Sequence, residues 1–104
     1  MTVLPDSLVE EVARRFALLG DPTRLRVVRT LHDLGESSVQ EVADATGTTM
    51  ANASQHLARL RDSGIVRRRR LGKSVRYSIS DPTIEALCVT VCDSVRTRAQ
   101  ALSA

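Results

Sequence analysis

The polar side chains best suited to contact DNA bases lie between Thr49 and Arg59, in a stretch whose apolar residues recur with the period of a helix. The apolar residues on one face of this helix are Met50, Ala53, Leu57 and Leu60. The polar residues on or beside the other side are Thr49, Asn52, Ser54, Gln55, His56 and Arg59. Amide side chains suit adenine edges, and the shorter polar groups suit bases or phosphate. The stretch therefore predicts a DNA-contacting helix that Thr49 caps and that ends at Ser63-Gly64.

A cluster of basic residues follows this helix. Residues 59–76 hold eight of the fifteen Lys and Arg side chains and one acid, Asp62. This stretch therefore carries +7 and the rest of the chain −4, within a net charge of +3. Such asymmetry favours a polyanionic partner, because each phosphate that is neutralised releases counterions. The alternative is a basic surface that contacts only solvent. The expected phosphate contacts are Arg67, Arg68, Arg69, Arg70, Lys73 and Arg76.

The residues after this helix have the pattern of a β-hairpin. Val75, Tyr77 and Ile79 alternate with polar residues, which is the period of a half-buried strand. Residues 67–70 form the expected partner strand, with Leu71-Gly72-Lys73 as the turn. A helix followed by a basic two-stranded ribbon is typical of a winged helix-turn-helix, in which the helix enters a major groove and the ribbon lies along phosphate or a neighbouring groove.

Three further helices precede the DNA-contacting one. The first runs from Asp6 to Leu19; the second starts at Asp21-Pro22 and is closed by Gly35; the third starts at Ser38, which forms a capping box with Glu41. Their expected core residues are Leu8, Val12, Phe16 and Leu19; Leu25, Val28, Leu31 and Leu34; and Val39, Val42 and Ala43. The third and fourth helices, joined across residues 46–48, make the helix-turn-helix.

A last helix begins at Asp81-Pro82 and has a long apolar stripe. The stripe is Ile84, Leu87, Cys88, Val91, Val95, Ala99 and Leu102. A domain of this size cannot cover about five turns of helix, so we expect the first and last helices to pair with a second copy. The alternative is a helix that packs only on its own domain. The predicted fold is therefore mainly α, with five helices and a two-stranded wing, in one DNA-binding domain over residues 1–104.

Length and composition are consistent with this fold. The 104 residues suit one domain, and with one Phe, one Tyr and no Trp the core must be aliphatic, which favours helices. No apolar run approaches the length of a membrane span, and no leader is recognisable, so we expect a cytoplasmic protein. Nor does the sequence contain a phosphate-binding glycine loop or a nucleophile with a base and an orienting group. We therefore expect no enzymatic activity.

Three segments of the chain resemble the ArsR/SmtB family of bacterial winged-helix repressors. They are LGDPTRLRVVRTL, SVQEVADATG and TTMANASQHLARLRDSGIVRRRRLGKSVRYSI. The resemblance implies a homodimer that binds palindromic operator DNA and releases it when a metal ion, metalloid or thiol-reactive species binds. Arsenic and cadmium sensors of the family often have Cys-x-Cys in the third helix, where this chain has Ser38 and Gln40. The histidines of the zinc and nickel sensors are absent from the last helix, which leaves Asp81 and Asp93.

Cys88 and Cys92 are the remaining effector candidates. They are four residues apart and so neighbours on one helical face, where they can share a soft ion or metalloid with a third ligand, or be oxidised. The alternative is that both thiols pack in the apolar stripe. His32 is a further ligand candidate, although a surface or capping role at a helix C-terminus suits it better. His56 suits a DNA contact better than a metal.

Three functions remain open. The first is a homodimeric transcriptional repressor, or less often an activator, that a small inducer such as a transition-metal ion, a metalloid or reactive sulfur releases from double-stranded operator DNA. The second is a regulator without its own inducer, controlled by a partner protein or by its abundance. The third is a winged-helix module for protein contact. If the thiols only pack, the remaining ligand candidates are His32, the N-terminal amine and the acids of the first helix.

Overall fold

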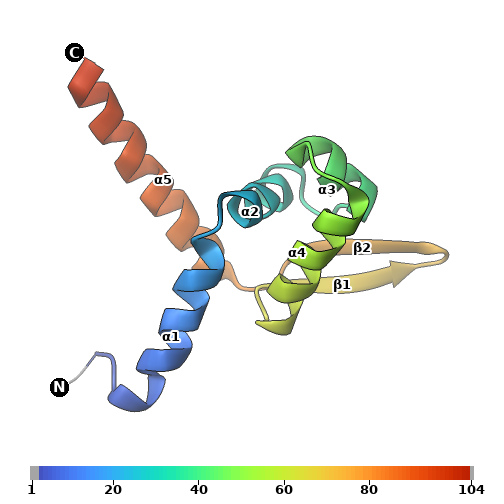
Figure 1. Cartoon of the computed structure of the whole chain (residues 1–104), viewed down its shortest axis with the longest axis horizontal. Helices are drawn as coiled ribbons and strands as arrows, with labels where there is room; N and C mark the ends of the chain where they lie inside the picture. Colours follow the sequence, from blue (N-terminus) through green and yellow to red (C-terminus); the bar gives the residue numbers. More distant parts are fainter. Residues whose placement is uncertain (1–2, 104) are drawn as a thin grey trace.

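Five helices and one hairpin make up the fold. The computed structural model describes residues 3–103. The elements are α1 (Asp6–Leu19), α2 (Pro22–Leu34), α3 (Val39–Thr46), α4 (Met50–Asp62), β1 (Val66–Leu71), β2 (Ser74–Ile79) and α5 (Pro82–Ser103). Figure 1 shows α2, α3 and α4 grouped against the hairpin, while α1 and α5 lie at the other side of the molecule. Within residues 3–103, no helix is long and apolar enough to cross a membrane.

Side-chain caps set the starts of the central helices. The carboxylate of Asp21 accepts a hydrogen bond from the backbone N–H of Arg24, and Pro22 follows at the first helical position. Ser38 and Glu41 form a reciprocal capping box, and the hydroxyl of Thr49 accepts from the N–H of Asn52. Each cap satisfies N–H groups that the helix itself leaves unpaired. The start of each of these helices was predicted correctly for this reason.

The core lies between α2, α3, α4 and the hairpin. Its most deeply buried side chains are Val27, Val42, Leu57, Leu60, Ile65 and Val66. Val28, Leu31, Val42, Ala43, Ala53, Leu57 and Leu60 were predicted to face inward, and all are buried. The predictions for Leu25, Leu34 and Met50 were wrong, since each is at least 40% exposed. On α2 the buried face is centred nearer Val27 and Thr30, because α3 and α4 cover that side of the helix.

The hairpin is a wing whose second strand is paired on both edges. β1 and β2 are antiparallel, with Arg68 opposite Tyr77 and Arg69 opposite Arg76. On the other edge of β2, the backbone of Tyr77 exchanges two hydrogen bonds with that of Ser37, at 2.8 and 2.9 Å. Leu71, predicted in the turn, instead closes the ladder opposite Ser74. The turn is therefore only Gly72-Lys73, and Gly72 supplies its positive φ of 60°.

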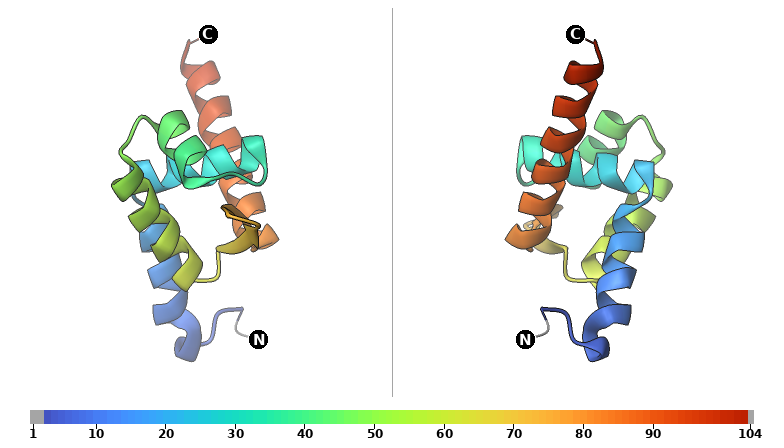
Figure 2. Two further views of the ribbon diagram at one scale, coloured as in Figure 1. Left: turned by 90° about the vertical axis from the view of Figure 1, so that its right-hand side faces the viewer. Right: turned by 90° about the vertical axis from the view of Figure 1, so that its left-hand side faces the viewer.

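The terminal helices leave most of their apolar stripes exposed. Figure 2 shows α5 extending beyond the body of the molecule. Only Leu19 of α1 and Ile84 of α5 are buried, whereas Phe16 is 57% exposed, Val95 63% and Leu102 78%. The prediction that one side of α1 is buried is therefore wrong within a single chain. The predicted stripes are present, but residues 3–103 of one chain leave most of them uncovered.

Candidate nucleic-acid interface

The outer face of α4 presents exposed polar side chains. Thr49, Asn52, Ser54, Gln55 and Arg59 are all exposed, as the spacing of the sequence predicted. The opposite face holds Ala53, Leu57 and Leu60, which are completely buried and fix the helix on the core. A helix of this width, rigidly seated and with free amides on its outer side, has the dimensions and chemistry for a major groove.

His56 differs from its neighbours on α4. Its side chain is only 20% exposed, so it is less open to solvent than the expected position on the exposed side of the helix, beside Ser54 and Gln55, implied. Its Nδ1 accepts a hydrogen bond from Nε of Arg24, at 3.4 Å. Arg24 is in the first turn of α2, so the contact joins the start of α2 to α4. His56 therefore lies at the border between the outer face of α4 and the neighbouring helix.

Two wing arginines are paired with acids of the same chain. Arg69 donates two hydrogen bonds to Glu36, at 2.6 and 2.9 Å, and Arg76 donates one to Glu41, at 2.6 Å. The hydrogen bonds from Arg69 lower the pKa of the Glu36 carboxyl below its ordinary value. The pKa of Glu41 is also lowered, first by its hydrogen bonds with Ser38 and then by Arg76. These pairs reduce the charge that the wing has available for a polyanion.

The remaining wing residues are more available. Arg68, Arg70 and Lys73 are exposed, and their side chains make no hydrogen bond or ion pair within residues 3–103. Arg67 donates to the hydroxyl of Ser78 at 3.2 Å. The basic residues that remain free thus lie along β1 and at the wing tip, beyond the body of the domain.

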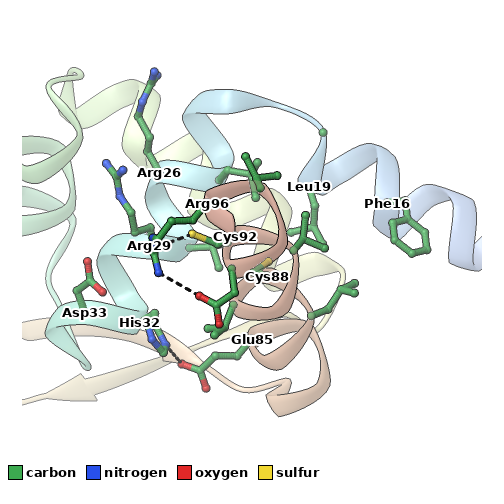
Figure 3. Close-up of a pocket in the computed structure, with 18 residues that line it drawn as sticks. Phe16, Leu19, Arg26, Arg29, His32, Asp33, Glu85, Cys88, Cys92 and Arg96 are labelled. Carbon is green, nitrogen blue, oxygen red and sulfur yellow. Dashed lines mark hydrogen bonds and ion pairs between the residues drawn. The ribbon is translucent and has the colours of Figure 1, made fainter. Parts of the chain in front are cut away.

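A groove lies on the other side of the molecule, between α1, α2 and α5. It encloses about 830 Å³, and its lining is mostly apolar. Figure 3 shows Phe16 and Leu19 of α1, His32 of α2 and Cys88 of α5 around it. At its edge, Nδ1 of His32 lies 2.7 Å from Oε2 of Glu85, and this hydrogen bond raises the pKa of the imidazole. His32 is therefore a link between α2 and α5, a role that its position in the sequence did not indicate.

The two thiols on α5 have different surroundings. Cys88 is half-buried, and burial raises the pKa of its thiol. Cys92 is exposed, and Nη2 of Arg96 donates a hydrogen bond to its sulfur at 3.5 Å (Figure 3). Among residues 3–103, no group of three or more His, Cys, Asp or Glu side chains is arranged to hold a metal ion. The described part of one chain therefore places no third ligand of these types beside the two thiols, and the N-terminal amine lies outside the described residues.

Comparison with known proteins identifies the family. A model described as a helix-turn-helix domain matches residues 19–69. The chain is 38% identical to the HTH-type transcriptional regulator KmtR of Mycobacterium tuberculosis, over 83% of this chain and 65% of the relative. It is 40% identical to the arsenical resistance operon repressor of Escherichia coli, over 75% of this chain and 66% of the relative.

Solved structures agree with these relatives over almost the whole chain. The crystal structure of the antimony-specific transcriptional repressor AntR superimposes with a TM-score of 0.86 at 28% identity, over 96% of this chain and 90% of that one. The NMR structure of the homodimeric winged helix-turn-helix domain of Mb0332 from Mycobacterium bovis gives 0.83 at 29% identity, over 97% and 95%. The chain belongs to the ArsR family. Its members are DNA-binding transcriptional regulators, not enzymes.

The ArsR assignment confirms the predicted fold and family. The chain spans just under two thirds of the length of the first curated relatives. Sequence reasoning missed the side-chain pairs around the ArsR wing, because Glu36 and Glu41 lie more than 30 residues from the arginines that they bind. The capping-box spacing did identify Glu41, but only for its role at the start of α3.

Proposed function

We propose that this chain is a homodimeric transcriptional repressor that binds operator DNA through α4 and the wing. In this proposal the DNA-binding residues are those predicted from the sequence: Thr49, Asn52, Ser54, Gln55, His56 and Arg59 on α4, and Arg67, Arg68, Arg69, Arg70, Lys73 and Arg76 on the wing. Arg69 and Arg76 contribute less than the other wing residues, because Glu36 and Glu41 hold their guanidinium groups. The regulator acts in the cytoplasm, on double-stranded DNA. Residues 1–104 act as one domain that both binds DNA and dimerises.

One observation carries the proposal. The exposed polar face of α4 and the free cations of the wing lie on neighbouring elements that share one rigid core. The helix offers groups that distinguish base edges, and the wing offers charges that hold phosphate. A protein-contact module has no need of the two together.

The unpaired stripes of α1 and α5 support the homodimer. A second copy that covers them removes from water the side chains of Phe16, Val91 and Val95, each more than half exposed in one chain. A two-fold axis there also presents two α4 helices to successive major grooves, about 34 Å apart on the DNA. The homodimeric Mb0332 domain, which has the same fold, adds support.

Cys88 and Cys92 are the proposed inducer site, with a thiol-seeking species such as a metalloid, a soft metal ion or reactive sulfur as the inducer. AntR, an antimony-specific repressor, is a structural neighbour of this chain. Because Cys92 is exposed in one chain and α5 lies at the proposed seam, a second copy is placed to supply the missing ligand. An inducer bound there releases DNA only if it favours a dimer whose α4 helices no longer match the groove repeat.

The test is binding of the purified chain to its own promoter fragment. We expect protection of a two-fold site, with affinity that falls steeply as salt rises, because phosphate contacts release counterions. Titration with a panel of metal ions, arsenite and persulfide should then identify the species that releases the DNA. Salt-insensitive or absent binding would contradict the proposal and favour a protein-contact module.

A further inference from the structure

Arg24 lies where three helices meet. Its side chain is only 12% exposed. Nη1 donates a hydrogen bond to the backbone carbonyl of Leu18, near the end of α1, at 3.0 Å. Nε donates to Nδ1 of His56 on α4, at 3.4 Å. The arginine therefore ties the DNA-contacting helix to the end of α1 through the first turn of α2.

The direction of this contact sets the proton pattern of His56. A guanidinium group has donors only and keeps its protons throughout the working pH range. Nδ1 must therefore accept, which leaves the single proton of the neutral ring on Nε2. The charged groups facing Nδ1 are Arg24 and Asp21, whose carboxylate oxygen is 3.9 Å away and so beyond hydrogen-bond distance.

The other side of the ring is available to a ligand. Nε2 of His56 has no hydrogen-bond partner among residues 3–103. Every buried side-chain nitrogen or oxygen of those residues has a hydrogen-bond partner, so Nε2 is not fully buried. Nε2 therefore reaches the surface. Asn52 precedes His56 by one turn and Arg59 follows it by three residues, so the three residues are neighbours on one side of α4.

We propose that Arg24 is a positioning residue that makes His56 a specificity-determining donor, with Nε2–H directed at an acceptor of a guanine edge. This inference rests on the proposed DNA binding. Guanine presents two acceptors, N7 and O6, in the major groove, whereas adenine and thymine present one each, and the cytosine edge presents an amino donor that a fixed N–H rejects. Without Arg24 the proton can occupy either ring nitrogen, and the ring can turn, so the discrimination is lost.

The first experiment measures the tautomer directly in the free protein. Nitrogen-15 NMR of the imidazole rings should show the proton of His56 on Nε2. Arg24→Met should give a mixture of tautomers, whereas Arg26→Met, an exposed arginine on the same helix, should leave the spectrum unchanged. A proton on Nδ1 in the wild type would overturn the proposal.

The second experiment measures base reading. Operator DNA is made with 7-deazaguanine, which lacks N7, or 2-aminopurine, which lacks O6, at single guanines. At one guanine the wild type should lose about 2- to 12-fold in affinity, the range for one hydrogen bond. His56→Ala should lose about that much on natural operator and show no further loss on the modified DNA. Arg24→Met, in which only part of the rings carry the proton on Nε2, should lose less on natural operator and show a smaller further loss than the wild type on the modified DNA.

The remaining outcomes distinguish a base contact of His56 from a phosphate contact and test the role of Arg24. An equal loss for His56→Ala on operator and random DNA would make the residue a phosphate contact. An Arg24→Met protein that senses the modified guanine as strongly as the wild type would remove Arg24 from the mechanism. If a thermal melt shows that Arg24→Met is unfolded, the test rests on the tautomer of the wild type and on the binding of His56→Ala to natural and modified DNA. A wild type with no operator binding would instead overturn the proposed function, while a proton on Nε2 would still support the positioning by Arg24.

Discussion

Arg69 of β1 reaches across the wing to Glu36, and both carboxylate oxygens of Glu36 accept hydrogen bonds from its guanidinium, at 2.6 and 2.9 Å. Because Glu36 directly precedes the residue that pairs with β2, this contact joins the outer strand of the wing to its base. The pair holds in place a cation that would otherwise be free to meet phosphate.

Removing the Glu36 charge should strengthen binding to DNA of any sequence. In Glu36→Gln, Arg69 loses its ionic partner, and one more phosphate contact should steepen the salt dependence by about one unit of slope. Glu10→Gln, an exposed acid on α1, is the matched control for net charge. Salt titrations read by fluorescence anisotropy measure both. An unchanged slope would mean that Arg69 stays directed at the base of the wing.

The free and paired wing cations should differ in their effects. Lys73→Ala should weaken binding to all sequences and flatten the salt slope by about one unit, because this residue meets no acid of the described chain. Arg69→Ala should flatten it much less. The same titrations test this, and a loss of specificity with an unchanged slope in Lys73→Ala would identify a base contact instead.

Gln55 should read a base. It is exposed on α4, where its amide matches the donor and acceptor of an adenine edge. Gln55→Ala should cost about 1 to 3 kcal/mol on the operator and much less on random DNA. Competition binding against both DNAs gives the two values. Equal losses would remove Gln55 from the readout.

The two thiols should be needed for release of the operator by the inducer, not for binding of the operator. A Cys88→Ser, Cys92→Ser variant should remain a dimer and bind the operator, yet stay bound when the thiol-seeking inducer is added. If the thiols only pack in the proposed seam between two copies, the variant should respond normally but lose about 1 to 3 kcal/mol of stability, because a hydroxyl there is left without a partner. Release assays and thermal melts distinguish these cases. Normal release would exclude the two cysteines as the sensor.

The contact between His32 and Glu85 should make the junction of α2 and α5 sensitive to pH. The pKa of His32 is raised from 6.5, so the contact stabilises the fold fully below about pH 6.5 and less as pH rises through the raised value. Melting temperatures of the wild type and His32→Gln should therefore converge as pH rises from 6 towards 9. A difference that stays constant would mean that the imidazole contributes by packing alone.

Residues close together in the sequence were sufficient to predict the helices and strands. The features that the sequence did not predict depend on contacts between residues far apart in the chain. Asp21-Pro22, the Ser38 and Glu41 capping box and Thr49 act within one turn of chain, so the spacing of the sequence was sufficient to place three helix starts. The periodicity of the sequence shows that Phe16 and Val95 belong to apolar stripes, but not which part of the protein covers them. In the proposed dimer, a second copy covers them. The half-burial of His56 also depends on how α4 crosses α2.

The run of four arginines on β1 has a consequence apart from DNA. β2 is paired on both edges, by β1 and at Ser37, whereas the outer edge of β1 meets no strand among residues 3–103. An open edge of this kind can recruit strands from other molecules and begin aggregation, which charged side chains oppose. Arg67 to Arg70 repel a second such edge, so the wing also protects the solubility of the protein. Neutralising several of them together would lower DNA affinity and promote self-association at once.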